Sequence, residues 1–190
     1  LENHPHLFSG GILMASGVMY LRLLILLALF NRQLLALLWL PFVVLACAAV
    51  VFGWLWTRRA DKEAQTAERD LEPKNPLELT TALLFALLFL VVLVATQLAV
   101  KYFGNGGVDT LAAIVGVSDI NPFVLGMTQA AGTLTAVKVA AGAILIAAAS
   151  NNVVNGVYAY SLADRKTGTL SLTFLLSLAG AALVPLIWLL

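Results

Sequence analysis

The sequence predicts an all-α fold, a polytopic membrane helical bundle with five spanning helices and one broken segment. Of its 190 residues, 61% are hydrophobic and only 11% are charged, whereas soluble domains carry about 25% charged residues. Five apolar stretches are also long enough to cross a bilayer, which takes about 20 residues. We therefore expect a single transmembrane domain over residues 1–190, embedded in the lipid bilayer.

The first two helices are predicted to form an antiparallel hairpin over residues 10–56. Residues 31–33 are a short polar link between two apolar runs, and a link of this length joins antiparallel neighbours. Trp54 and Trp56 close the second run, at the level where aromatic side chains gather at a membrane interface.

A charged loop over residues 58–78 follows the hairpin. It holds 11 charged side chains, whereas the other 169 residues hold only 10. Five of the 11 are lysine or arginine, so the positive-inside rule predicts that this loop is cytoplasmic. The third helix is predicted over residues 79–100, after the helix-start signal Asn75-Pro76.

The segment over residues 109–131 is apolar but is broken in its middle by Gly116, Ser118, Asp119 and Pro122. One interpretation is a full crossing. The other is a re-entrant pair of half-helices, 109–117 and 122–131, each about 15 Å long. We favour re-entry, because it brings the basic residues near position 165 to the same side as loop 58–78.

The break is also the first half of a predicted ligand- or ion-binding site. Asn121 precedes a proline, so we expect it to be non-helical and to cap the half-helix that follows. Ser118, Asp119 and the freed carbonyls offer oxygens to a cation, and an acid at membrane depth marks a functional site by default. The structural alternative is that Asp119 caps the half-helix or pairs with a buried cation.

The long helix predicted over residues 134–162 supplies the other half of the site. Ser150, Asn151 and Asn155 lie in its middle, and the i, i+4 spacing of the two asparagines places their amides on one face. Gly156 follows, which predicts local unwinding. The alternative is that these amides only form interhelical hydrogen bonds. The last helix is predicted over residues 170–190.

A structural ion pair is expected between Arg22, midway along the first helix, and Asp119. An arginine cannot readily lose its proton, so at this depth it requires a partner. Lys138 is the alternative cation. An Arg22–Asp119 pair would neutralise two charges in the interior of the bundle.

Several function classes are excluded by what the sequence lacks. Cys47 is the single cysteine and both histidines lie near the start, so we predict no nucleophilic triad, no metal site, no cofactor and no enzymatic activity. No basic patch with interleaved aromatic residues predicts nucleic-acid binding. The chain lacks an initiator methionine, and we read it as a processed part of a longer protein.

Six runs of sequence follow one another along the chain: ASGVMYLR at 15–22, NPLEL at 75–79, ALLFA at 82–86, YFG at 102–104, GVSDI at 116–120 and Ala149-Ser150-Asn151. They resemble the C-terminal membrane domain, domain of unknown function 4010, of MgtC/SapB-like bacterial inner-membrane proteins. The resemblance implies a location in the bacterial inner membrane and an upstream MgtC-like domain as partner. MgtC-like proteins are linked to growth under magnesium limitation and to membrane energetics.

The function that we predict is a transporter or channel-like module for a small ion or solute, with both halves of the site meeting near the midplane. The alternative is a non-transporting regulatory or assembly module that docks other membrane proteins, with the polar residues acting as interhelical contacts. A homo-oligomer is compatible with both hypotheses.

Overall fold

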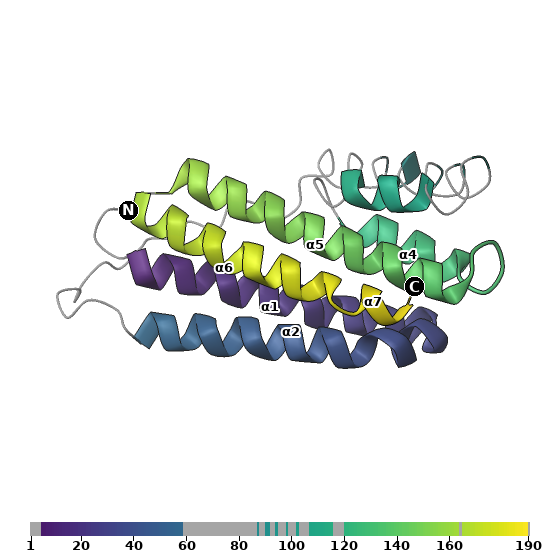
Figure 1. Cartoon of the computed structure of the whole chain (residues 1–190), viewed down its shortest axis with the longest axis horizontal. Helices are drawn as coiled ribbons and strands as arrows, with labels where there is room; N and C mark the ends of the chain where they lie inside the picture. The colour runs from purple at the N-terminus through teal and green to yellow at the C-terminus, as the bar shows by residue number, and fades with distance from the viewer. Residues whose placement is uncertain are drawn as a thin grey trace.

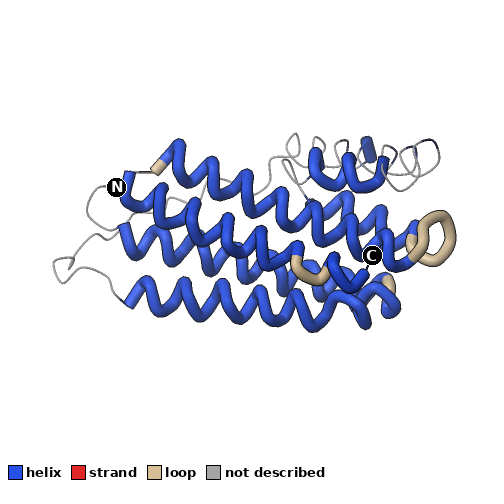
Figure 2. Tube along the Cα trace, viewed as in Figure 1, coloured by secondary structure: helices blue, strands red, loops and turns tan. Residues whose placement is uncertain are grey.

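The computed structural model describes residues 5–58, 107–115, 120–163 and 165–189, together with positions 87, 90, 91, 94, 98 and 102. Within these residues the chain is helical, and helices joined by short loops account for the whole fold (Figure 2). Most of the predicted helix 79–100, the loop residues 59–78, and Ser118 and Asp119 lie outside the described residues.

The first two helices form an antiparallel hairpin. Helix α1 is Pro5–Phe30 and helix α2 is Arg32–Arg58, with only Asn31 between them. Their backbones meet at glycine: a Cβ added to Gly10 would lie 2.7 Å from the Gly53 carbonyl oxygen. Small residues allow helices in a membrane to approach this closely, and the dispersion contacts that result hold them together.

A second hairpin consists of α5 (Val137–Leu162) and α6 (Arg165–Leu183). A Cβ on Gly168 would lie 2.8 Å from the Tyr160 Cα, so these two helices also approach each other at a glycine. Helix α6 ends just before Pro185 and a short helix, α7 (Leu186–Leu189), follows. Proline lacks the N–H that would continue the helix.

Two expectations about this second hairpin are wrong. Helix α5 is continuous through the asparagine-rich region, so no local unwinding occurs at Gly156. That glycine instead lets α6 approach, because a Cβ there would lie 3.0 Å from a Leu172 side-chain carbon. The last helix also begins five residues before the predicted start at 170, at Arg165.

The predicted broken segment consists of a helical stretch at residues 107–115 and helix α4 (Ile120–Ala130). Both lie beside α5, at the end of the bundle where the α1–α2 turn is found (Figure 1). Helix α4 has 11 residues and is therefore about 16 Å long, which is half of a hydrocarbon core. Its last turn lies against Asn31, in the turn between α1 and α2.

The core lies between the two hairpins. In α5 it is built from alanines, including Ala143, Ala147 and Ala148, which are fully buried. Opposite them lie large side chains from the first hairpin. The largest fully buried side chains include Tyr20, Leu23, Leu27, Leu34, Leu38, Phe42 and Phe123. Small residues on one helix facing large ones on another allow side chains to interdigitate without voids.

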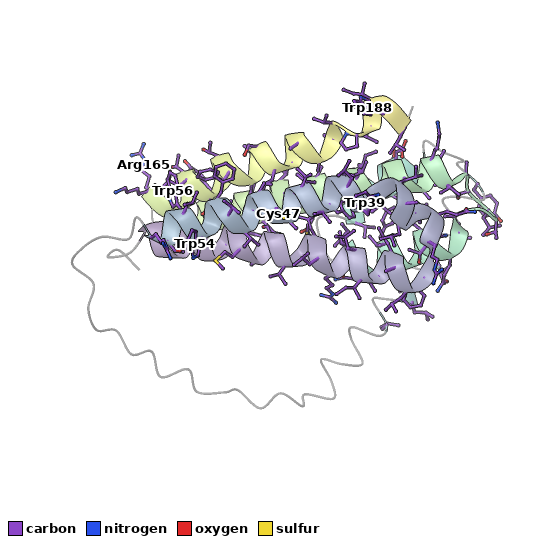
Figure 3. The ribbon with its side chains drawn as sticks, turned by 90° about the horizontal axis from the view of Figure 1, so that it is seen from below. Trp39, Cys47, Trp54, Trp56, Arg165 and Trp188 are labelled. Atoms are coloured by element: carbon purple, nitrogen blue, oxygen red, sulfur yellow. The ribbon has the colours of Figure 1, made fainter. Side chains whose placement is uncertain are left out.

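Four helical stretches have the length and composition of membrane-spanning helices: Ser9–Phe30, Arg32–Arg58, Val137–Ser161 and Arg165–Leu189. The fifth predicted span, 79–100, lies outside the residues in which spans could be sought. Trp54 and Trp56 lie with Arg165 at one end of the bundle, and Trp39 and Trp188 lie toward the other (Figure 3). The chain is an integral membrane protein by these features.

Candidate functional site

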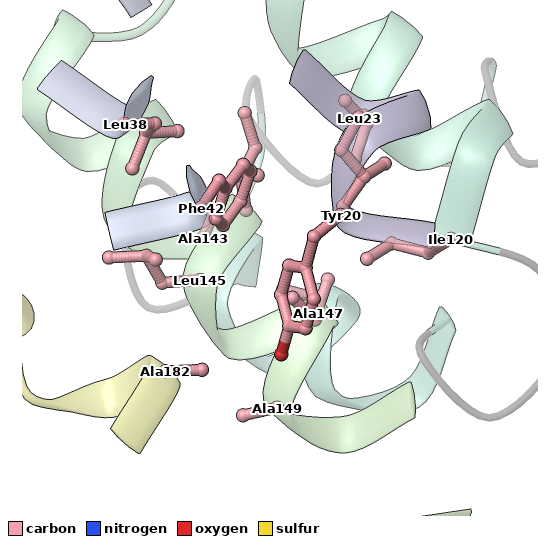
Figure 4. Packing of buried hydrophobic residues seen from close by; sticks show 14 of the residues in the cluster. Tyr20, Leu23, Leu38, Phe42, Ile120, Ala143, Leu145, Ala147, Ala149 and Ala182 are labelled. Carbon is pink, nitrogen blue, oxygen red and sulfur yellow. The ribbon is translucent and has the colours of Figure 1, made fainter. Parts of the chain in front are cut away.

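A buried polar pair links the two hairpins at mid-depth. The Asn152 Nδ2 of α5 donates a hydrogen bond of 2.5 Å to the Tyr20 hydroxyl of α1, and both side chains are 0% exposed. The Tyr20 ring packs on Phe42 of α2 with 5.5 Å between ring centroids, which fixes the direction of the hydroxyl. Figure 4 shows this hydroxyl directed at the Ala147–Ala149 region of α5.

This pair leaves hydrogen-bonding capacity unused. The Asn152 Oδ1 is buried and has no hydrogen-bond partner among the described residues. The Tyr20 hydroxyl accepts its bond from Asn152, so its own hydrogen is still available for donation. A carboxamide oxygen without a partner is costly in an apolar interior, so this position favours a polar group from outside the helices.

The predicted residues of α5 are found close to this pair. Asn155 Nδ2 donates to Asn151 Oδ1 over 3.0 Å, which confirms that the i, i+4 spacing places the two amides on one face. Ser150 Oγ donates to the Ala113 carbonyl oxygen over 2.6 Å. The serine thereby joins α5 to the helical stretch 107–115, immediately before the break.

The Ser150 contact joins the polar side of α5 to the first part of the broken segment. The Ser150 Oγ donates to the carbonyl oxygen of Ala113, in the helical stretch 107–115. The side of α5 that carries the predicted polar residues therefore faces this stretch.

Asn121 lies on the other side of the break, but not as expected. Helix α4 begins at Ile120, so Asn121 is inside the first helical turn and does not precede the helix as a cap. Pro122 is tolerated there because an N–H in the first turn has no helical partner to lose. Ile120 itself packs near Tyr20 (Figure 4), so α4 begins beside the Tyr20–Asn152 pair.

The ends of α1 carry two further polar links between the halves of the molecule. Ser9 Oγ donates to the Thr167 carbonyl oxygen of α6 over 3.3 Å, and both residues are buried. At the other end, Asn31 Nδ2 donates to the Thr128 carbonyl oxygen of α4 over 3.0 Å. Asn31 Oδ1 accepts from the backbone N–H groups of Gln33 and Leu34, each over 3.1 Å, and so caps α2.

The charged side chains of this region lie outside the core. Arg22 and Lys138, the two cations expected to neutralise Asp119, are both exposed among the described residues. Asp119 lies outside those residues, so the Arg22–Asp119 pair stays a prediction. Asp109, outside the four candidate spans, is half-buried, and burial raises the pKa of its carboxyl above the usual range.

Sequence reasoning assigned no role to Tyr20 and set Asn152 apart from the site. One signal for the tyrosine was available, because a phenol in the middle of an apolar helix requires a hydrogen-bond partner. The sequence did not indicate which residue that partner is, since Asn152 is 132 positions away. In the part of the chain that the structure describes, no group of three metal-binding side chains occurs.

Comparisons with known proteins give a family and no activity. No solved structure matches the chain. A protein of Aquifex aeolicus (strain VF5), described as "Uncharacterized protein", is 29% identical over 134 residues, which cover 70% of this chain and 56% of the relative. The chain therefore spans little more than half the length of that relative. The family model with the description "Domain of unknown function (DUF4010)" matches residues 2–163, and the chain belongs to this family.

Proposed function

We propose that the chain is a membrane transport module that holds a small ion or polar solute at mid-depth in the bundle. The observation that supports this most is the fully buried Tyr20–Asn152 pair, whose amide oxygen has no partner among the described residues. Polar groups inside a membrane are costly and commonly mark substrate or ion pathways. Here the pair lies beside the start of a half-length helix.

The broken segment is proposed to re-enter the membrane without crossing it. Gly10 packs on Thr57, and Ser9 bonds to Thr167, so α2 ends and α6 begins at the same face of the bundle. Helix α4 ends at the opposite face, where Asn31 bonds to Thr128. If residues 79–100 cross once, the segment 109–131 starts and ends at that opposite face.

Re-entry explains why a half-length helix begins next to the polar pair. In discontinuous transporter helices, the N–H groups at the start of one half-helix and the carbonyls at the end of the other face the ligand. The Ala113 carbonyl oxygen of stretch 107–115 accepts a hydrogen bond from Ser150, and α4 begins near Tyr20. Ser118 and Asp119 lie between these two ends in sequence and are proposed to complete the site.

The positive-inside rule supports one orientation for this arrangement. Arg58, Arg165 and Lys166 all lie at the face where α2 ends and α6 begins. Together with the basic residues of loop 58–78, they make this face the more basic one, and we propose that it is cytoplasmic. The membrane is then the bacterial inner membrane, as the resemblance to MgtC/SapB-like proteins implies.

Flux through the purified protein in liposomes tests this function. The panel is protons, Mg²⁺, K⁺, Na⁺, small anions and small uncharged solutes, for the wild type and for Asp119→Asn. Val18→Ala, at an exposed position of α1, is the control for reconstitution. Flux of one class that Asp119→Asn abolishes and Val18→Ala preserves would support a transport site.

The second candidate is a regulatory or assembly module that binds an upstream MgtC-like domain, another membrane protein or a second copy. The Asn151–Asn155 bond favours it, because these two amides bond to each other along one helix. Absence of flux for every solute, measured with the full-length protein too, would favour this candidate over transport.

A further inference from the structure

Three polar residues lie on one line along helix α1 and the turn that follows it. Ser9, Tyr20 and Asn31 are each eleven residues apart, about three helical turns and about 16 Å. Each forms a hydrogen bond to the half of the molecule that contains α4, α5 and α6. We call this boundary, from Ser9 to Asn31, the α1 seam. Its length of about 33 Å equals the hydrocarbon thickness of a bilayer.

The seam differs from the interiors of the two hairpins in how the helices meet. Within the hairpins, backbones touch at glycine: Gly10 and Gly53 meet between α1 and α2, and Gly168 meets Tyr160 between α5 and α6. The three bonds across the seam instead come from the side chains of Ser9, Tyr20 and Asn31. Side-chain bonds can change partner while the tight backbone contacts within each hairpin persist.

Two buried polar atoms beside the seam have no hydrogen-bond partner among the described residues. One is Asn152 Oδ1, at the centre. The other is Ser171 Oγ, whose residue is 0% exposed and lies one helical turn beyond Thr167 on the same face of α6. A hydroxyl and a carboxamide therefore offer hydrogen bonds toward the seam at two depths.

Among the residues that the structure describes, the groups along the seam are uncharged. They are hydroxyls, a phenol and carboxamides, whereas the described cations Arg22, Arg32, Arg58, Lys138, Arg165 and Lys166 are all exposed. An ion at mid-depth needs a counter-charge or a full coordination shell. A small neutral solute needs only donors and acceptors that replace its hydration.

We infer that the α1 seam is the path of a small uncharged polar solute, a polyol or an amide, with the Tyr20 hydroxyl and the Asn152 carboxamide as its central binding groups. This inference rests on the proposed transport function and narrows its substrate class. The solute donates a hydrogen bond to Asn152 Oδ1 and accepts one from the Tyr20 hydroxyl. It thereby supplies bonds that these two groups do not make with the described residues.

The test is the permeability of liposomes containing the full chain to glycerol and urea, followed by stopped-flow light scattering. Tyr20→Phe removes the central hydroxyl, and Tyr158→Phe, at a half-exposed tyrosine of α5, is the matched control. Loss of one membrane hydrogen bond is expected to lower the rate about three- to eighteen-fold for Tyr20→Phe and for Asn152→Leu. Tyr158→Phe should equal the wild type.

A second readout does not depend on flux. In a Cys47→Ser background, which has no other cysteine, Ser16→Cys lies on the buried seam side of α1 and Val18→Cys lies on its exposed side. A path that admits glycerol or urea must let a small uncharged thiol reagent, methyl methanethiosulfonate, reach Ser16→Cys. Val18→Cys should stay unmodified because it faces lipid.

The outcomes separate this inference from the function on which it rests. Ion flux without glycerol or urea flux would overturn the uncharged solute and leave the transport function standing. Glycerol or urea flux that Tyr20→Phe and Asn152→Leu leave unchanged would overturn the α1 seam as the path, and so would an unreactive Ser16→Cys. Absence of all flux would overturn both.

Discussion

At the scale of single residues, the centre of the molecule depends on two side chains that are polar and completely buried. Tyr20 and Asn152 share one hydrogen bond. Removal of either side chain leaves the other with an unpaired polar group in an apolar interior. The cost is the desolvation of the remaining group. Hydrogen bonds between membrane helices contribute about 0.6 kcal/mol on average, so the coupling should be measurable but modest.

A double-mutant cycle over Tyr20→Phe and Asn152→Ala should give a coupling free energy of about 0.6–1.7 kcal/mol. Each single change should lower the free energy of unfolding, because the residues face each other in the fully buried core. The measurement is equilibrium unfolding in mixed micelles, followed by tryptophan fluorescence. Additive effects would show that the two side chains do not interact.

The side-chain oxygen and nitrogen of Asn31 have separate roles. Its oxygen caps α2 and its nitrogen holds α4. Asn31→Ser keeps an acceptor for the cap and loses the bond to α4, whereas Asn31→Ala loses both. We expect Asn31→Ala to be less stable than Asn31→Ser by about 1 kcal/mol, the usual value of a helix cap, in the same unfolding assay. Equal stabilities would contradict the capping role.

The sequence was a good guide to residues whose partners are near in the chain. The bond between Asn151 and Asn155 follows from helical periodicity alone. The bond between Ser150 and Ala113 and that between Asn152 and Tyr20 join distant positions, and periodicity contains no information on which helices are neighbours. Helical periodicity therefore predicted which α5 amides share a face, whereas it gave no indication that Tyr20 contacts Asn152.

At the scale of elements, glycines decide how closely neighbouring helices approach. Gly10 and Gly11 are adjacent in α1, yet only Gly10 faces α2. The apolar runs and the short polar link at 31–33 predicted this hairpin, because they depend on local composition. The continuity of α5 was not predicted, since an asparagine cluster before a glycine reads equally as a break and as a buried polar face that packs on α6.

Gly10→Ala should lower the free energy of unfolding by about 1–3 kcal/mol, the usual cost of overpacking. Its Cβ would lie 2.7 Å from a backbone oxygen of Gly53, which cannot move aside as a side chain can. Gly11→Ala is the matched control, because no atom lies within 4 Å of its Cβ. It should be neutral or stabilising by about 0.5 kcal/mol. Equal losses for both would contradict the packing of α1 on α2.

At the scale of the whole molecule, the two hairpins determine which helix ends lie at the same face of the bundle. The turn at Asn31 and the start of α5 lie at one face, and the ends of α2 and α5 lie at the other (Figure 1). The composition predicted a membrane bundle without difficulty. The four candidate spans follow from length and composition, whereas the packing was needed to show which of their ends lie at the same face.

Single cysteines at Lys138 and Lys166 should label from opposite sides of the membrane. Both positions are exposed, and α5 lies between them. In a Cys47→Ser background, Lys166→Cys should react with an impermeant maleimide only in inverted vesicles, and Lys138→Cys only in intact cells. Labelling of both from one side would contradict the membrane crossing of α5, and a reversed pattern would contradict the proposed orientation.

The double use of Asn31 also implies an order of assembly. Its oxygen binds backbone groups two and three positions away, so this contact can form as soon as the first hairpin has entered the bilayer. Its nitrogen binds a carbonyl 97 positions away, which is synthesised much later. Until α4 arrives, the turn of the hairpin presents an idle donor at the membrane surface. The early hairpin thus carries a docking point for a segment that the ribosome has yet to make.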